Sequence, residues 1–135
     1  MFKQKGFTIL ELLIVLVIIA ILVIIAIPNF SRARKTARIG ATIDTLRNIC
    51  SAEEAYFAKM TYKTYGKLSD LASKKFLDDR FTESELILNG YKYSSYADNT
   101  KFRVTATPIK ENYPTFYVDE TFIIKFANGA PIGSH

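Results

Sequence analysis

The chain has one cysteine, Cys50, and one histidine, His135, among its 135 residues. A lone cysteine excludes an intrachain disulfide, and a lone histidine with no clustered ligands does not predict a zinc site. Because Cys50 has apolar neighbours at helical spacing, we expect a buried core thiol rather than a reactive one. No nucleophile has a base nearby in the sequence. We therefore expect a protein that is not an enzyme, with no catalytic residue, bound metal or cofactor.

Two pairs of adjacent carboxylates, Asp78-Asp79 and Asp119-Glu120, are the remaining candidates for chemistry. Such pairs belong to turns more often than to general acid–base sites, and turns are our interpretation here. Their oxygens would suit calcium, but the spacing matches no calcium-loop motif.

The excess of positive charge is local. The chain carries 18 Lys and Arg against 13 Asp and Glu, for a formal net charge of +5. From residue 39 onward the two signs balance, so a general nucleic-acid-binding surface is not indicated. Four basic residues closely follow a long apolar run, and they suit anionic lipid headgroups or acidic residues of an adjacent subunit. These four are Arg32, Arg34, Lys35 and Arg38.

Polar residues, glycine and proline are all absent from residues 12–27. Counted from Phe7, the apolar segment has 21 residues, and a helix of that length covers about 31 Å, enough to cross the hydrocarbon core of a bilayer. A helix that is apolar on all sides indicates a membrane span or a packed helical bundle. Pro28 follows the run, and we expect it to bend or break the helix there.

Glu11 is the ionisable residue inside this apolar segment. A carboxylate in a span costs roughly 2.5 to 3.5 kcal/mol near the helix centre and less near its end, so it needs a partner. Thr8 and Glu11 fit a capping box, which the helix dipole also favours. Pairing with a cation of another molecule would instead fix the register of a bundle. The sequence leaves both interpretations open.

The run Lys5-Gly6-Phe7-Thr8-Ile9-Leu10-Glu11-Leu12-Leu13, with a short basic leader before it and an apolar run to Pro28 after it, closely resembles the N-terminal signature of type IV pilins and pseudopilins. The resemblance is specific over residues 1 to about 38. It implies that a membrane peptidase removes the leader, residues 1–6, by cutting between Gly6 and Phe7, and methylates Phe7 as the new N-terminus. It also implies that Glu11 pairs with the terminal amine of Phe7 in a neighbouring subunit during assembly.

Beyond the apolar run the pattern is first amphipathic and then alternating. Apolar residues at three-, four- and seven-residue steps predict a long helix, and alternation near the C-terminus predicts strands. We expect an α+β fold, with a long N-terminal helix packed on a small antiparallel sheet of about four strands; the resemblance implies the same fold. The expected boundaries are 7–28 for the membrane or filament-core helix, 29–60 for its amphipathic half, and 61–135 for the globular region, divided into a connecting loop 61–89, a sheet 90–127 and a mobile tail 128–135.

The resemblance implies a structural subunit of a type IV pilus. Such a chain is made as a single-pass prepilin of the bacterial inner membrane with its C-terminal region outside, and then joins an extracellular filament. Its implied partners are further copies, the prepilin peptidase/methyltransferase, the assembly platform with its ATPase, and membrane lipid before assembly. Counting charges on the two sides of the span would place the C-terminal region in the cytoplasm instead; we follow the more specific cleavage signature.

Two alternatives to a pilus subunit stay open. One is a pseudopilin of a type II secretion-like system, which carries the same N-terminal signature. The other is a membrane-anchored extracytoplasmic binding domain that never polymerises. A simple anchor has no need of Glu11 and would tolerate leucine there, so this residue argues against the second alternative.

Overall fold

The computed structural model describes residues 6–132, so most of the expected leader, and His135, lie outside the described part. The chain divides into two compact units, Met1–Thr36 and Ala37–His135. We call the first the stem unit and the second the head unit. The head unit begins well before residue 61, where we expected the globular region to start, because the last part of the long helix belongs to its core.

A single helix, α1 (Ile9–Lys59), contains both the apolar run and the amphipathic segment. Pro28 lies inside this helix, at the point where we expected a bend or break. Proline removes one backbone hydrogen bond, to the carbonyl four residues earlier, while the bonds on either side remain available to the helix. The apolar and amphipathic halves thus form one long helix, as expected.

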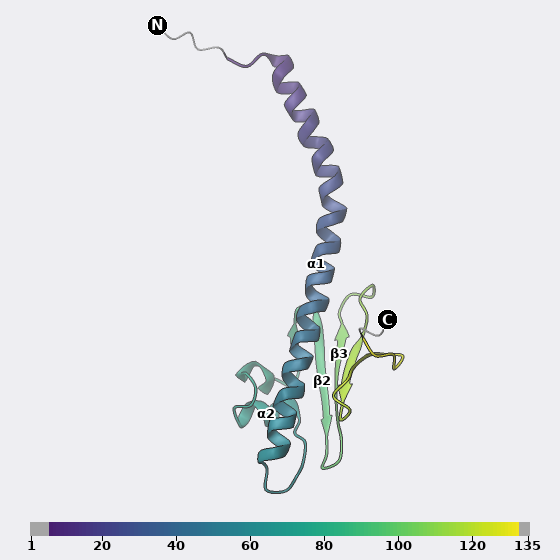
Figure 1. Ribbon diagram of the computed structural model, residues 1–135. Helices are drawn as coiled ribbons and strands as arrows, with labels where there is room; N and C mark the ends of the chain where they lie inside the picture. Colours follow the sequence, from purple (N-terminus) through teal and green to yellow (C-terminus); the bar gives the residue numbers. More distant parts are fainter. Residues whose placement is uncertain (1–5, 133–135) are drawn as a thin grey trace. The chain divides into compact units, whose positions relative to one another are not determined.

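The C-terminal part of α1 supplies the helical half of the head core. Its buried residues follow the three- and four-residue spacing of one helix face and pack with the sheet (Figure 1). They are Thr42, Leu46, Ile49, Ala52, Glu53 and Tyr56. Burial of this face holds the helix on the sheet, because each large apolar side chain contributes about 1.5–3 kcal/mol when removed from water.

The sheet is open and antiparallel throughout, with the order β1-β2-β3-β4-β5. The α+β class is thus confirmed, with five strands where we expected about four. The strands are β1 (Leu86–Leu88), β2 (Tyr91–Ala97), β3 (Phe102–Pro108), β4 (Phe116–Asp119) and β5 (Ile124–Phe126). Strand β1 was not expected, because three residues are too few to show an alternating pattern. It ends directly before the Asn89-Gly90 turn.

The connection between α1 and the sheet carries two short helices, α2 (Leu68–Ser73) and the 3-10 helix η1 (Asp79–Thr82). At the other end, residues 128–132 turn back beside β5, where we expected a mobile tail. The Phe126 N–H donates to the Ala130 carbonyl at 2.8 Å, and the Ile132 N–H donates to the Ile124 carbonyl at 3.1 Å. These bonds satisfy backbone groups that β5, an edge strand, would otherwise expose.

Candidate assembly site

Apolar side chains are exposed on every side of the stem unit. Phe7 is 86% exposed and Ile9 is 88% exposed, and the apolar residues that follow as far as Phe30 are all exposed as well. Among the described residues, α1 is the one helix long and apolar enough to span a membrane by length and composition. Exposed apolar surface of this extent requires lipid or other protein around it, since isolated patches on soluble proteins are far smaller.

Thr8 and Glu11 form a reciprocal capping box at the start of α1. The Glu11 N–H donates to Thr8 Oγ1 at 3.0 Å, and the Thr8 N–H donates to Glu11 Oε2 at 3.4 Å. The second distance is longer than the usual range for N–H···O bonds, so this half of the box is weak. The carboxylate therefore has a partner within its own chain, and only a weak bond holds it there.

Gly6 and Phe7 precede the helix, in a segment without regular structure. A Cβ added at Gly6 would meet no atom within 4 Å. The chain's own packing therefore does not require glycine at this position.

The four basic residues after the apolar run are divided between the two units. Arg34 lies over the Phe30 ring, with 5.8 Å from its guanidinium carbon to the ring centroid. Arg38 is in the head unit, where it lines a small cavity of about 140 Å³ with Gly90 and Ile109. Arg32 and Lys35 are in the stem unit, and Arg32 is exposed. A spread of cations along a helix suits a broad anionic surface better than one bound anion.

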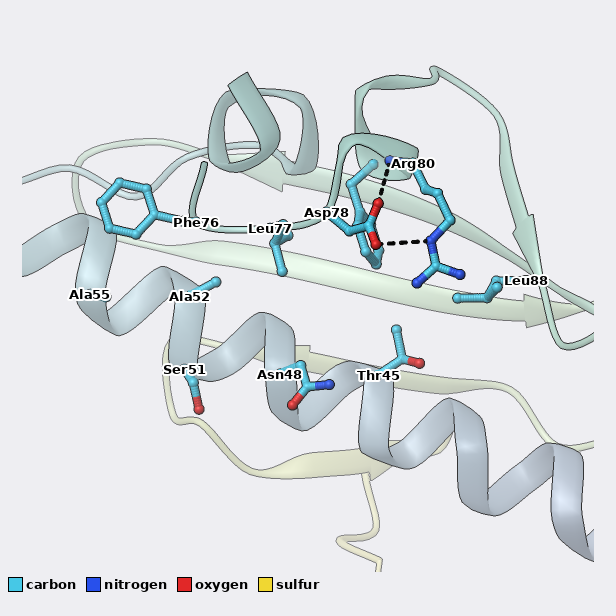
Figure 2. A pocket seen from close by; sticks show the side chains of 11 residues that line it. Thr45, Asn48, Ser51, Ala52, Ala55, Phe76, Leu77, Asp78, Arg80 and Leu88 are labelled. Carbon is cyan, nitrogen blue, oxygen red and sulfur yellow. Dashed lines mark hydrogen bonds and ion pairs between the residues drawn. The ribbon is translucent and has the colours of Figure 1, made fainter. Parts of the chain in front are cut away.

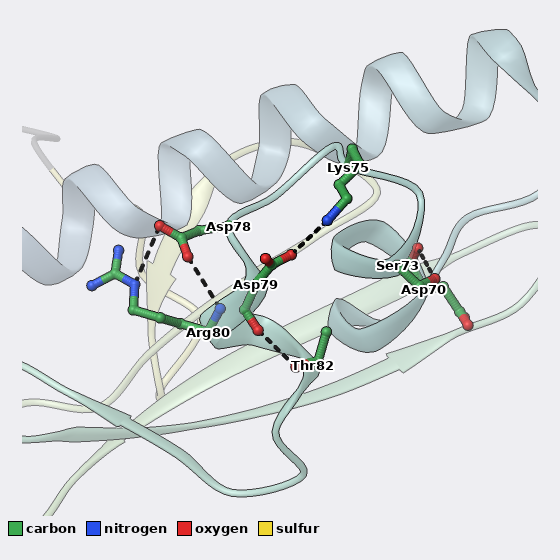
Figure 3. A network of polar contacts seen from close by, with 7 residues as sticks. All are labelled: Asp70, Ser73, Lys75, Asp78, Asp79, Arg80 and Thr82. Carbon is green, nitrogen blue, oxygen red and sulfur yellow. Dashed lines mark hydrogen bonds and ion pairs between the residues drawn. The ribbon is translucent and has the colours of Figure 1, made fainter.

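The two acidic pairs occupy turns and a helix cap. Asp78 is the N-cap of η1 and accepts the Arg80 N–H at 3.1 Å, while Asp79 pairs with Lys75 at 3.0 Å (Figure 3). Asp119 accepts the Thr121 N–H at 3.1 Å in the β4–β5 turn. These bonds to near neighbours account structurally for Asp78, Asp79 and Asp119. Within residues 6–132 no group of three or more His, Cys, Asp or Glu side chains could hold a metal ion.

Cys50 is partly buried in the head unit, on α1. Burial, with a smaller contribution from Glu53, raises the pKa of its thiol to about 11. The thiolate is the nucleophilic form of cysteine, so at neutral pH this side chain is in its unreactive form.

Glu53 is a notable residue that the sequence analysis did not single out. Its side chain is fully buried in the head core, where Oε2 accepts the Gly66 N–H at 3.1 Å and Oε1 has no hydrogen-bond partner. Burial, with Asp70 nearby, raises the pKa of Glu53 to about 7, against the opposing effect of the Gly66 bond. In the sequence Glu53 and Glu54 stand side by side on the helix, and only the helical phase hints that one of them faces inward.

Comparison with known proteins agrees with the N-terminal pattern. Residues 1–27 match the family model described as the prokaryotic N-terminal methylation motif. This motif is the signature of type IV pilins and pseudopilins, and the match spans the leader, Gly6, Phe7, Glu11 and the whole apolar run to residue 27. The resemblance proposed from these residues is thus confirmed over this segment. Searches of curated proteins and of solved structures give no match to the chain.

Proposed function

We propose that the chain is the structural subunit of a type IV pilus filament. The observation that carries this proposal is the methylation motif over residues 1–27 joined to a helix whose apolar surface is exposed on every side. The motif indicates a pilin- or pseudopilin-like precursor with a membrane anchor, which is a structural kind of protein rather than an enzyme. In the proposed filament, the stem helices of many copies supply the apolar surroundings that each stem lacks by itself.

The first step is maturation in the membrane. The precursor spans the bacterial inner membrane once, with the head unit outside, and the prepilin peptidase cuts the Gly6–Phe7 bond and methylates the amine of Phe7. The cut bond lies outside regular structure, as a protease requires of its substrate. The space around Gly6 in this chain supports a glycine requirement imposed by the peptidase.

The second step is pairing of charges during assembly. Trimming creates an ammonium at Phe7, and an ammonium and a carboxylate that are each costly in an apolar bundle offset one another when they pair. Glu11 of the neighbouring copy is the proposed partner. Its hydrogen bond from the Thr8 N–H is long and weak, at 3.4 Å. Exchanging that bond for a charged partner therefore costs little. A subunit out of register would bury an unpaired charge, and the pairing therefore selects the correct register.

Extraction from the membrane needs an external source of energy. Transfer of the stem from lipid to a helical bundle yields little hydrophobic free energy, because both surroundings are apolar. The pilus assembly platform and its ATPase are the proposed partners for this step. Before extraction, Arg32, Arg34, Lys35 and Arg38 face anionic lipid; after it, they face acidic residues of adjacent copies.

The first test is the intact mass of the protein from its own host, with sequencing of its N-terminal peptide. A chain that begins at methylated Phe7 supports the proposal. A chain that still begins at Met1, in cells with an active prepilin peptidase, contradicts it and favours a membrane-anchored domain. Protease added outside spheroplasts tests the topology, since it should digest the head unit. Electron microscopy of sheared material then separates a surface pilus from a short secretion pseudopilus.

A further inference from the structure

A groove lies in the head unit between one flank of α1 and the segment that joins α2 to β1 (Figure 2). Its volume is about 550 Å³. Phe76, Leu77 and Leu88 give it an apolar wall, and on the α1 side Asn48 and Ser51 are short polar residues that leave room above the helix. We call this feature the α1 groove.

A cation stands at the rim of the α1 groove. The guanidinium of Arg80 lies over the groove (Figure 2), with its Nε 3.5 Å from Asp78 Oδ2. The Arg80 side chain is 55% exposed, so the contact to Asp78 leaves much of the guanidinium open to another molecule. The groove therefore combines an apolar wall with a half-exposed guanidinium at its edge, beside the Asp78 carboxylate. A ligand that fits has apolar side chains and a carboxylate beside them.

The turn between β4 and β5 has that composition. Glu120, Thr121, Phe122 and Ile123 are all exposed, and we call them the acidic knob. Phe122 is 40% exposed and Ile123 is 49% exposed. Two adjacent large apolar side chains are thus partly exposed in this turn, and the Glu120 carboxylate lies two residues before Phe122.

The acidic knob is held in one conformation. Phe122 has a φ of 60°, a left-handed conformation that is strained for an aromatic residue and is found where the surrounding structure enforces it. Its N–H donates to the Asp119 carbonyl at 2.9 Å, and its ring contacts the rings of Tyr65 and Phe102. A rigid knob loses little entropy on docking, which favours a specific contact.

The α1 groove and the acidic knob flank the same stretch of α1. The groove is lined by Asn48 and Ser51, among others. Phe122 and Ile123 share a second hollow with Arg47, Cys50 and Ser51. Ser51 borders both, so the two features lie at the same height along the helix, one on each side of its outward face. Two copies placed side by side with parallel helices thus present the knob of one to the groove of the other.

We propose that Phe122 and Ile123 of one copy seat in the α1 groove of the next copy, with Glu120 against Arg80. This inference rests on the proposed function, since a filament supplies the parallel copies. The contact joins two different surfaces of the same chain, so it leaves a free knob at one end and a free groove at the other. Such a heterologous contact builds an open helical array rather than a closed dimer. The complementary charges set the orientation in which the apolar surfaces meet.

The test is disulfide cross-linking in filaments assembled from the full chain. Cys50→Ala first removes the native thiol, and Asn48→Cys and Ile123→Cys are then introduced together. Mild oxidation of sheared filaments should give a ladder of disulfide-linked copies on a non-reducing gel, and each single-cysteine chain should stop at the dimer or below. The matched control pairs Asn48→Cys with Ile87→Cys, since Ile87 is 57% exposed on β1 and belongs to neither surface; this pair should give no ladder.

Exchange of the charges of Arg80 and Glu120 is a second test. Arg80→Glu and Glu120→Arg should each strongly reduce the ladder, and the double variant should restore it. If either residue had only a structural role, the double variant would not restore the ladder. Filaments that form normally but give no ladder would overturn the knob-and-groove contact and leave the proposed function intact. Absence of filaments from the wild-type chain would overturn the proposed function, and this inference with it.

Discussion

Replacement of Glu53 by glutamine should remove a pH dependence from the stability of the head unit. The wild-type carboxyl is fully buried, and burial raises its pKa from the ordinary value of 4.5 to about 7. A folded state that binds a proton more tightly than the unfolded state loses stability as pH rises between the two pKa values. Stability from this group is therefore complete below pH 4.5, falls between pH 4.5 and 7, and is constant above pH 7.

The magnitude follows from the shift. The difference between 4.5 and about 7, at about 1.4 kcal/mol per pH unit, is about 3 kcal/mol as an upper bound. Glutamine has the same shape, can accept the Gly66 N–H as Glu53 does, and does not ionise. We expect the stability of the Glu53→Gln chain relative to wild type to rise by about 2–3 kcal/mol between pH 4.5 and pH 8. The comparison at two pH values cancels any constant cost of the new amide group, which lies near the unpartnered Oε1 position.

The assay is urea unfolding of the full chain in detergent micelles, followed by near-ultraviolet circular dichroism. The chain has 8 Tyr and no Trp, and buried Tyr91 and Tyr93 in the head unit supply the signal. Glu54→Gln is the matched control, since Glu54 is the exposed neighbour on the same helix and should show no such change. The reasoning is refuted if the difference between wild type and Glu53→Gln is the same at both pH values, or if Glu54→Gln changes equally.

Three further expectations test the stem and the packing of the connecting segment. Glu11→Ala should leave membrane insertion and trimming intact but abolish filaments, as seen by electron microscopy of sheared material; normal filaments would contradict the pairing role. Gly6→Val should leave untrimmed precursor on an immunoblot, and efficient trimming would contradict the cleavage site. Gly66→Ala should destabilise the head unit by about 1–3 kcal/mol, because the new Cβ would lie 3.0 Å from Tyr56 Cε1. Gly40→Ala, with no atom within 4 Å, is its control and should stabilise α1 by about 0.5–1 kcal/mol; equal effects of the two changes would show that the close contact is relieved without cost.

The stem could be predicted from the sequence because its structure depends on few distant contacts. Residues 12–27 are all apolar, so a helix of these residues has no polar face that would distinguish an inward side from an outward side. The backbone hydrogen bonds of a helix are local. The same holds for the β2–β3 hairpin, where strict alternation places Phe102, Val104 and Ala106 on the buried face. The capping box at Thr8 and Glu11 was readable for the same reason, since its partners are three residues apart.

The sequence by itself determined the parts that local pattern controls: the apolar helix, its cap, the amphipathic face and the long strands. Tertiary structure alone decided the features that need residues far apart in the chain. It added β1, a strand of three residues that exists through its register with β2. It buried Glu53 and left Glu54 exposed, through a bond to Gly66 thirteen residues away. It also set the acidic knob and the α1 groove on the two flanks of one helix. Such features depend on which distant side chains meet, and the period of a single segment carries no information about that.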